Sequence, residues 1–175
     1  STVNPMIPPA EIDAMRDSLP ERVFQQEILA QFIEDAGGVF RRVMDAATAE
    51  ERKPGDGEQF IFGVDWGKQS DFTCIAVMDT SGAMVAFDRF NQIDYAVQLG
   101  RLQAIAKRYP PASVIAERNS MGDPLVEQLQ RMGLPVQPFQ TTNATKAAAI
   151  DALSLAFERG DIRILPDSAL IAELQ

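Results

Sequence analysis

Two acidic residues in this chain stand where apolar runs of strand length end. Asp65 follows the run 60–64, and Glu117 follows the run 113–116. A strand ends on a carboxylate for a turn, an ion pair or a metal ion. If the two strands are neighbours, both acids reach the same sheet edge, the favoured location for sites in open mixed sheets. Paired oxygen ligands of this kind suit Mg²⁺ or Mn²⁺, and two such ions can hydrolyse a phosphodiester.

The composition excludes several other kinds of site. There is no histidine among the 175 residues, so Ser-His-Asp and Cys-His catalysis and His-ligated zinc are excluded. Cys74 is the only cysteine, which rules out an intrachain disulfide and fits a reducing, cytoplasmic setting. The net charge of −9 argues against tight binding of nucleic acid by this chain alone. It does not argue against a carboxylate metal site, because such sites add negative charge locally.

The elements that must position the two acids follow from the apolar periodicity. Strands are predicted at 60–65, 72–79, 83–90, 113–117 and 135–139, and helices at 93–109, 122–133 and 143–159, with a small strand at 162–165 and a last helix from 167. The first three strands form an antiparallel meander, and the crossover helices make the later strands parallel. The prediction is an α/β fold, a mixed sheet with helices on both faces.

Residues 1–57 are predicted to lie outside the sheet domain. An extended start precedes a helix over 10–18, and a second helix follows Pro20 over 21–35, with one apolar face. The polar segment 48–59 carries two glycines and a proline and is typical of a linker or long surface loop. The predicted division is a helical arm and linker at 1–57 and a catalytic-type domain at 58–175.

Several stretches together resemble a known family. They are "GVDWG" with a further Asp six residues after Asp65, "VIAERNSMGDPLVEQLQRMGLPVQPF" and "TTNATKAAAIDALSLAFERGDIRI". These resemble the nuclease domain of the large terminase subunit of tailed bacteriophages, whose fold is ribonuclease H-like. The arm "NPMIPPAEIDAMRDSLPERVFQQEILAQFIEDAGGVF" resembles the segment that joins the packaging ATPase of that family to its nuclease.

The resemblance implies a metal-dependent endonuclease that cuts concatemeric double-stranded viral DNA. Asp65 matches the first catalytic acid of the family and Glu117 the second, with two Mg²⁺ or Mn²⁺ ions as cofactors. The third acid is expected on an element beyond residue 175, so the domain is expected to be incomplete at its C-terminus. The implied partners are double-stranded DNA, an upstream packaging ATPase, the portal and the small terminase subunit, in the cytoplasm of a bacterial host.

Two more acids are candidates for the site. Asp71 lies in a loop where a turn or capping carboxylate is the ordinary role, and a place at the edge of the site is the alternative. Asp151 lies on the helix 143–159 and would either stand in for a third ligand or belong to a solvated helix face.

Four polar residues near the expected sheet edge could contact a phosphate. They are Lys68, Arg118, Asn119 and Lys146. A solvated surface cation is the alternative for the basic ones, and a turn residue for Asn119. Lys146 falls in the first turn of its helix, where the helix dipole disfavours a cation, and this favours a functional role.

Two other functions remain open on the sequence. A ribonuclease H-like junction-resolving nuclease would carry similar acids, although the arm would then be unexplained. A catalytically incomplete docking module of the packaging motor would fit the missing third acid, although intact Asp65 and Glu117 count against it.

Overall fold

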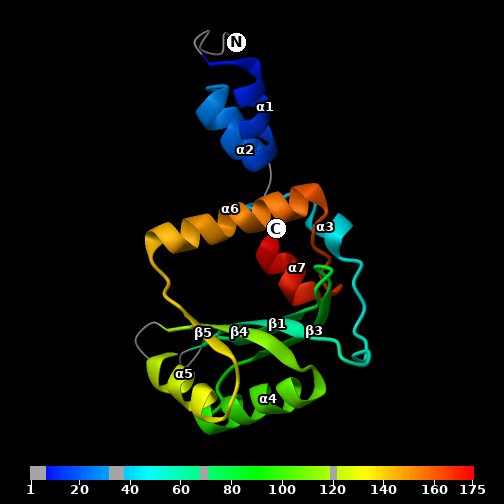
Figure 1. Ribbon diagram of the computed structural model, residues 1–175, viewed down its shortest axis with the longest axis vertical. Helices are drawn as coiled ribbons and strands as arrows, with labels where there is room; N and C mark the ends of the chain where they lie inside the picture. Colours follow the sequence, from blue (N-terminus) through cyan, green and yellow to red (C-terminus); the bar gives the residue numbers. More distant parts are fainter. Residues whose placement is uncertain (1–6, 32–37, 68–70, 119–121) are drawn as a thin grey trace.

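A five-stranded mixed sheet forms the centre of the molecule. The computed structural model describes residues 7–31, 38–67, 71–118 and 122–175. Its strands are β1 (Phe60–Asp65), β2 (Thr73–Met78), β3 (Met84–Phe90), β4 (Pro111–Glu117) and β5 (Val136–Phe139). Their order is β3-β2-β1-β4-β5, in which β1, β2 and β3 pair antiparallel and β1, β4 and β5 pair parallel (Figure 1). The predicted meander, the parallel strands and the fold class are confirmed.

One face of the sheet is covered by α4 (Tyr95–Arg108) and α5 (Gly122–Arg131) (Figure 1). Strand β1 alternates strictly between buried and exposed residues, which is the period of a strand with one buried face. The larger core lies in this layer. Its buried members include Phe60, Phe62, Val64, Trp66, Ile75, Val77, Leu99, Leu102, Val114, Leu125 and Leu129.

The opposite face is covered by α3 (Val43–Ala46), α6 (Asn143–Arg159) and α7 (Ser168–Leu174) (Figure 1). A second core here is centred on Val43, Met84, Phe157 and Ile164, and half-buried side chains of β2 and β3 pack against it. This core therefore covers the β2–β3 half of the face. The predicted strand at 162–165 is reduced to a single bridge between Ala83 and Arg163.

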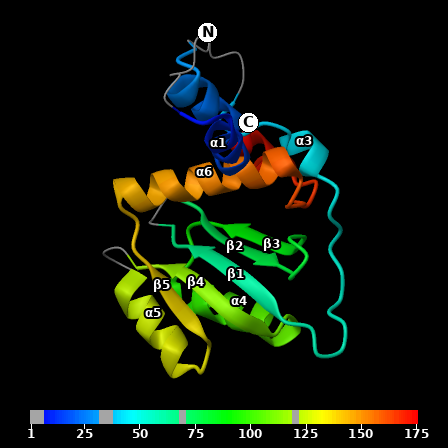
Figure 2. The same cartoon turned by 45° about the horizontal axis from the view of Figure 1, so that its top comes forward.

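The β1–β4 half of that face is more open. Ile61 of β1 and Ile115 of β4 are 42% and 40% exposed, and they alternate with residues buried on the α4–α5 side. The first half of α6, residues 143–149, is exposed along its whole length. Figure 2 shows β1 and β4 side by side below α6. The carboxyl ends of these two strands thus adjoin an open part of the sheet.

The arm contains α1 (Pro9–Ser18), α2 (Glu21–Val23) and the π-helix η1 (Phe24–Ile28). The helix predicted over 21–35 is therefore shorter than expected, since its helical part ends at Ile28, and its second part is a π-helix. Ala30 has a φ of +50°, a left-handed conformation that a continuous helix does not contain. Residues 32–35 of that prediction lie outside the described residues. The arm meets the end of α6, where the backbone N–H of Glu21 donates to Glu158 Oε2 at 2.8 Å.

The segment between α3 and β1 is anchored through Arg52. Its guanidinium binds Asp79 at 2.8 Å, and the Tyr109 hydroxyl donates to the Arg52 carbonyl at 2.9 Å. Asp79 also accepts hydrogen bonds from the hydroxyl of Ser81 and from the backbone N–H groups of Ser81 and Ala83. The loop predicted from its polar composition is therefore held against the β2–β3 turn. Among the described residues, no helix is both long and apolar enough to cross a membrane.

Candidate metal centre

Asp65 and Glu117 lie next to each other at the ends of two hydrogen-bonded strands. Strands β1 and β4 are parallel, with Val64 paired to Ala116, so the residue that follows each reaches the same edge. The two carboxyl groups share a side-chain hydrogen bond. Asp65 extends from the face opposite to Val64, which is the open side of the sheet. The sequence-based expectation that the topology brings these acids together holds in the structure.

The electrostatics of this pair favour a bound cation. Although Asp65 is an exposed residue, partial desolvation of its carboxyl, the hydrogen bond that its protonated form donates to Glu117 and the negative charge of Glu117 raise its pKa to about 6. A hydrogen bond from the Trp66 backbone N–H acts in the opposite direction. The raised pKa reflects first the partial desolvation of the Asp65 carboxyl and then the closeness of Glu117, whose negative charge opposes ionisation of Asp65. A divalent cation between them would remove that repulsion.

The donor set fits Mg²⁺ or Mn²⁺. Both side chains supply hard oxygen ligands, and no nitrogen or sulfur ligand is needed at this edge. Within the part of the chain that the structure describes, no three His, Cys, Asp or Glu side chains form a group that could hold a metal ion. The two acids therefore offer a partial ligand set, which water, substrate or further protein groups would complete.

The other acidic candidates do not join the pair in a group of three. Asp71 is exposed in the loop before β2, and its charge is near enough to contribute to the raised pKa of Asp65. Asp151 is exposed on α6. Their places at the edge of the site and as a stand-in ligand stay predictions.

The polar candidates lie at different places. Arg118 directly follows β4, and its guanidinium pairs with Asp123 at the start of α5 while remaining 57% exposed. Lys146 is exposed in the early part of α6, just after a capping box formed by Thr142 and Thr145. Lys68 and Asn119 lie outside the described residues. Phosphate contact by each of the four stays a prediction.

The sequence-based interpretation missed a buried polar group beside this site. Thr73 and Gln98 are 1% and 5% exposed, and both are hydrogen-bonded beneath the turn that follows Asp65. Gln98 thus lies on the buried face of α4, whereas its apolar neighbour Val97 is 50% exposed. A glutamine in the apolar stripe of a helix gave no periodic signal, although its position next to Leu99 could have drawn attention.

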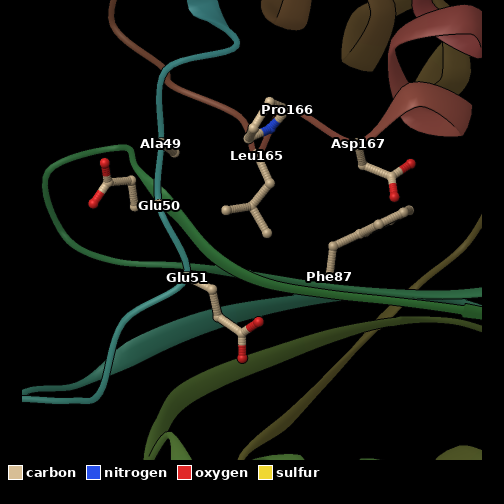
Figure 3. A pocket seen from close by; sticks show the side chains of 7 residues that line it. All are labelled: Ala49, Glu50, Glu51, Phe87, Leu165, Pro166 and Asp167. Atoms are coloured by element: carbon tan, nitrogen blue, oxygen red, sulfur yellow. The ribbon is translucent and has the colours of Figure 1, made fainter.

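A separate hollow lies at the β3 edge of the molecule. It has a volume of about 430 Å³, an apolar floor of Phe87, Leu165 and Pro166, and the acids Glu50, Glu51 and Asp167 around it (Figure 3). Neither Asp65 nor Glu117 is among the residues that line it. The acid pair is therefore a feature of the strand ends and not of this hollow.

The sheet order defines a ribonuclease H-like fold, and solved structures agree. One similar structure is the crystal structure of the large terminase nuclease from thermophilic phage G20c with bound magnesium. The superposed part covers 81% of this chain and 80% of the G20c chain, with a TM-score of 0.71 and 24% sequence identity. A second similar structure is the large terminase nuclease domain of Thermus phage P74-26. The superposed part covers 79% of this chain and 77% of the P74-26 chain, with a TM-score of 0.70 and 24% sequence identity.

The chain belongs to the terminase RNaseH-like domain family, whose model matches residues 62–173. The terminase large subunit of Thermus virus P23-45 is 27% identical over 170 residues, which cover 90% of this chain. That of Thermus phage G20c is 26% identical over a stretch of the same length. The chain spans about a third of each of these relatives, since the matched part is 35% of their length.

Proposed function

We propose that this chain is the endonuclease part of a viral genome-packaging terminase and that it hydrolyses double-stranded DNA with divalent metal ions. The observation that carries the proposal is the hydrogen-bonded pair Asp65 and Glu117 at adjacent strand ends, in a member of the terminase RNaseH-like family. Residues 58–175 would form the nuclease, and residues 1–57 would connect it to a packaging ATPase. The portal and the small terminase subunit are the further partners in this proposal.

The two acids would hold Mg²⁺ or Mn²⁺, with two ions expected at the full site. When bound, such ions supply activation of the attacking water and stabilisation of the leaving oxygen. The chain's own contribution is to hold the carboxylates at a fixed spacing on rigid strands, which lowers the cost of assembling the site. Lys146, Arg118, Lys68 and Asn119 would be the candidates for contacts with the DNA phosphates.

Cleavage of a supercoiled plasmid in Mn²⁺ or Mg²⁺ tests this function. The chain is expected to nick or linearise the plasmid only with metal, and Asp65→Asn is expected to lose this activity. Glu51→Gln is the matched control, because Glu51 lies at the hollow in Figure 3 and its loss leaves the pair intact. Cleavage that survives in Asp65→Asn would contradict the role given to Asp65. A preference for branched over linear duplex DNA would favour the junction-resolving alternative.

A further inference from the structure

Behind the acid pair, on the opposite face of the sheet, a chain of buried hydrogen bonds begins at the turn after Asp65. The backbone N–H of Gly67 donates to Thr73 Oγ1 at 2.8 Å. The Thr73 hydroxyl donates to Gln98 Oε1 at 2.8 Å, and Gln98 Nε2 donates to the Ile93 carbonyl at 2.9 Å. Each of these three hydrogen bonds has one donor and one acceptor, so together they run in one direction from the turn after β1 to α4.

The direction depends on Gln98. Its amide N–H is committed to the Ile93 carbonyl, so its oxygen faces Thr73 and accepts the hydroxyl proton. The Thr73 oxygen then presents a lone pair to Gly67. Because both side chains are buried, losing one partner would leave an unsatisfied polar group, which makes the arrangement all-or-none.

The backbone at Gly67 packs directly against the segment that leads into β2. A Cβ on Gly67 would lie 2.4 Å from the Asp71 carbonyl oxygen and 2.6 Å from the Thr73 nitrogen, so the two chain segments are in direct contact. The Trp66 ring is buried in the larger core. The backbone after Asp65 is thus held by a side chain on one side and by a hydrogen bond on the other. The backbone N–H of Trp66 belongs to this fixed segment, and it donates a hydrogen bond to the Asp65 carboxyl.

We propose that Thr73, oriented by Gln98, is a positioning residue for Asp65: it holds the Trp66–Gly67 backbone so that the Asp65 carboxyl stays beside Glu117 in the geometry that takes a divalent cation. The proposal rests on the metal-dependent function given above. It assigns to two buried polar residues, outside any contact with metal or DNA, the task of setting the affinity of the metal site. Outer groups that fix a ligand's orientation commonly change metal affinity by about 10–100-fold.

The test compares Thr73→Val, which keeps the shape and loses the hydroxyl, with Thr73→Ser, which keeps the hydroxyl and loses the methyl. Mn²⁺ affinity is measured by calorimetric titration, and amide hydrogen exchange is measured at Gly67. Thr73→Val is expected to bind Mn²⁺ about tenfold more weakly, as for other groups that orient a ligand, and to exchange the Gly67 amide faster. Thr73→Ser is expected to behave like the unchanged chain in both measurements.

A control variant separates positioning from general loss of stability. Val77 lies on the same strand and the same buried face as Thr73 and belongs to the core. Val77→Ala is expected to lower the melting temperature while leaving Mn²⁺ affinity unchanged. Gln98→Met, which keeps the length of the side chain but neither hydrogen bond, is expected to weaken Mn²⁺ binding in the same direction as Thr73→Val.

Mn²⁺ affinity in Thr73→Val equal to that of the unchanged chain would overturn the proposal, as would an equal loss in Thr73→Ser. Failure of the unchanged chain to bind Mn²⁺ would instead overturn the proposed function. In that case hydrogen exchange of the Gly67 amide still shows whether the Thr73 hydroxyl holds the turn. Exchange as slow in Thr73→Val as in the unchanged chain would show that the hydroxyl does not hold the turn, and faster exchange confined to the turn would show that it does.

Discussion

At the scale of single residues, the unusual feature is a pair of carboxyl groups that share a hydrogen bond at the end of two parallel strands. Asp65 retains its proton to about pH 6 because its carboxyl is partly desolvated and Glu117 lies beside it. Such an arrangement costs folding energy and is found where a protein needs the groups for binding or chemistry. Thr73 and Gln98 support the same turn from the buried side.

The pair predicts how the metal-free chain responds to pH. The folded pKa of Asp65 is about 6 against an ordinary value of 3.8, so the folded state holds the proton more firmly than the unfolded state does. The contribution of Asp65 to stability is therefore present below pH about 4 and is lost as the pH rises to about 6. Thermal melts in EDTA should show this loss in the unchanged chain and not in Asp65→Asn. A lower melting temperature for Asp65→Asn at pH 7.5 would contradict this interpretation of the pair.

The same proton affects metal binding. Below pH about 6 a cation must displace the proton on Asp65, so the Mn²⁺ affinity should fall as the pH falls through this value. Titrations at pH 5, 6, 7 and 8 measure the effect, and Glu51→Gln serves as a control with the pair intact. An affinity that does not change over this range would mean that Asp65 is not a ligand.

At the scale of elements, much of the arrangement could be predicted from the sequence. The periodicity located all five strands and the helices α4, α5, α6 and α7, because alternation and helical spacing are local signals. The four-residue helix α3, which also covers the sheet, is too short to give such a signal. The meeting of Asp65 with Glu117 was expected on the condition that β1 and β4 are neighbours, which the strand order of the structure fulfils. The Thr73–Gln98 contact could not be predicted, since it joins a strand to a helix 25 residues away and depends on side-chain orientation.

The turn after β1 should tolerate no added side chain. Gly67→Ala would place a Cβ 2.4 Å from backbone atoms of residues 71 and 72, and overpacking of this kind costs about 1–3 kcal/mol. Gly63→Ala is the matched control, because Gly63 lies on β1 just before this turn and a Cβ there would meet nothing within 4 Å. Chemical denaturation of both variants measures the difference. Equal stability of the two would show that the turn can rearrange freely.

The β2–β3 turn should make the chain sensitive to acid. Burial alone would raise the pKa of Asp79, but hydrogen bonds from Ser81, Arg52 and Ala83 outweigh it and hold the pKa well below its usual range. Asp79 therefore contributes stability above pH about 4 that is lost at lower pH. Asp79→Asn should lower the free energy of unfolding at pH 7 by about 1–3 kcal/mol, the usual cost of disturbing hydrogen bonds to a buried charged group.

The matched control for Asp79 is Asp45→Asn. Asp45 pairs with Arg42, and both side chains are more than half exposed, so this change should move the free energy of unfolding by at most about 0.5 kcal/mol. Urea denaturation at pH 7 and pH 3 compares the two. A similar small effect at both positions would mean that Asp79 does not stabilise the β2–β3 turn.

At the scale of the whole molecule, the sheet separates two cores of different extent. The α4–α5 side is covered along the sheet, whereas the α6 side is covered only over β2 and β3. Helix α6 spans both regions: its second half buries Phe157 in the smaller core, and its first half is exposed and carries Lys146. The open side is thus the one toward which Asp65 extends.

This division predicts where α6 is anchored. Phe157 is 1% exposed, and Phe157→Ala should lower the free energy of unfolding by about 3–5 kcal/mol, the usual cost of emptying a core site of this size. Ala147→Leu in the exposed half should change it by at most about 0.5 kcal/mol. Urea denaturation compares the two variants. A large cost at position 147 would mean that the first half of α6 is packed against the sheet.

The net charge of −9 argues against tight binding of nucleic acid by this chain alone, so metal binding is the more direct test of the acid pair. The decisive measurement is a calorimetric Mn²⁺ titration at pH 7.5 of the unchanged chain, Asp65→Asn, Glu117→Gln and the control Glu51→Gln. The account predicts that the unchanged chain and Glu51→Gln bind Mn²⁺ alike and that either change in the pair abolishes binding. Equal binding by all four proteins would contradict the assignment of Asp65 and Glu117 as the metal centre.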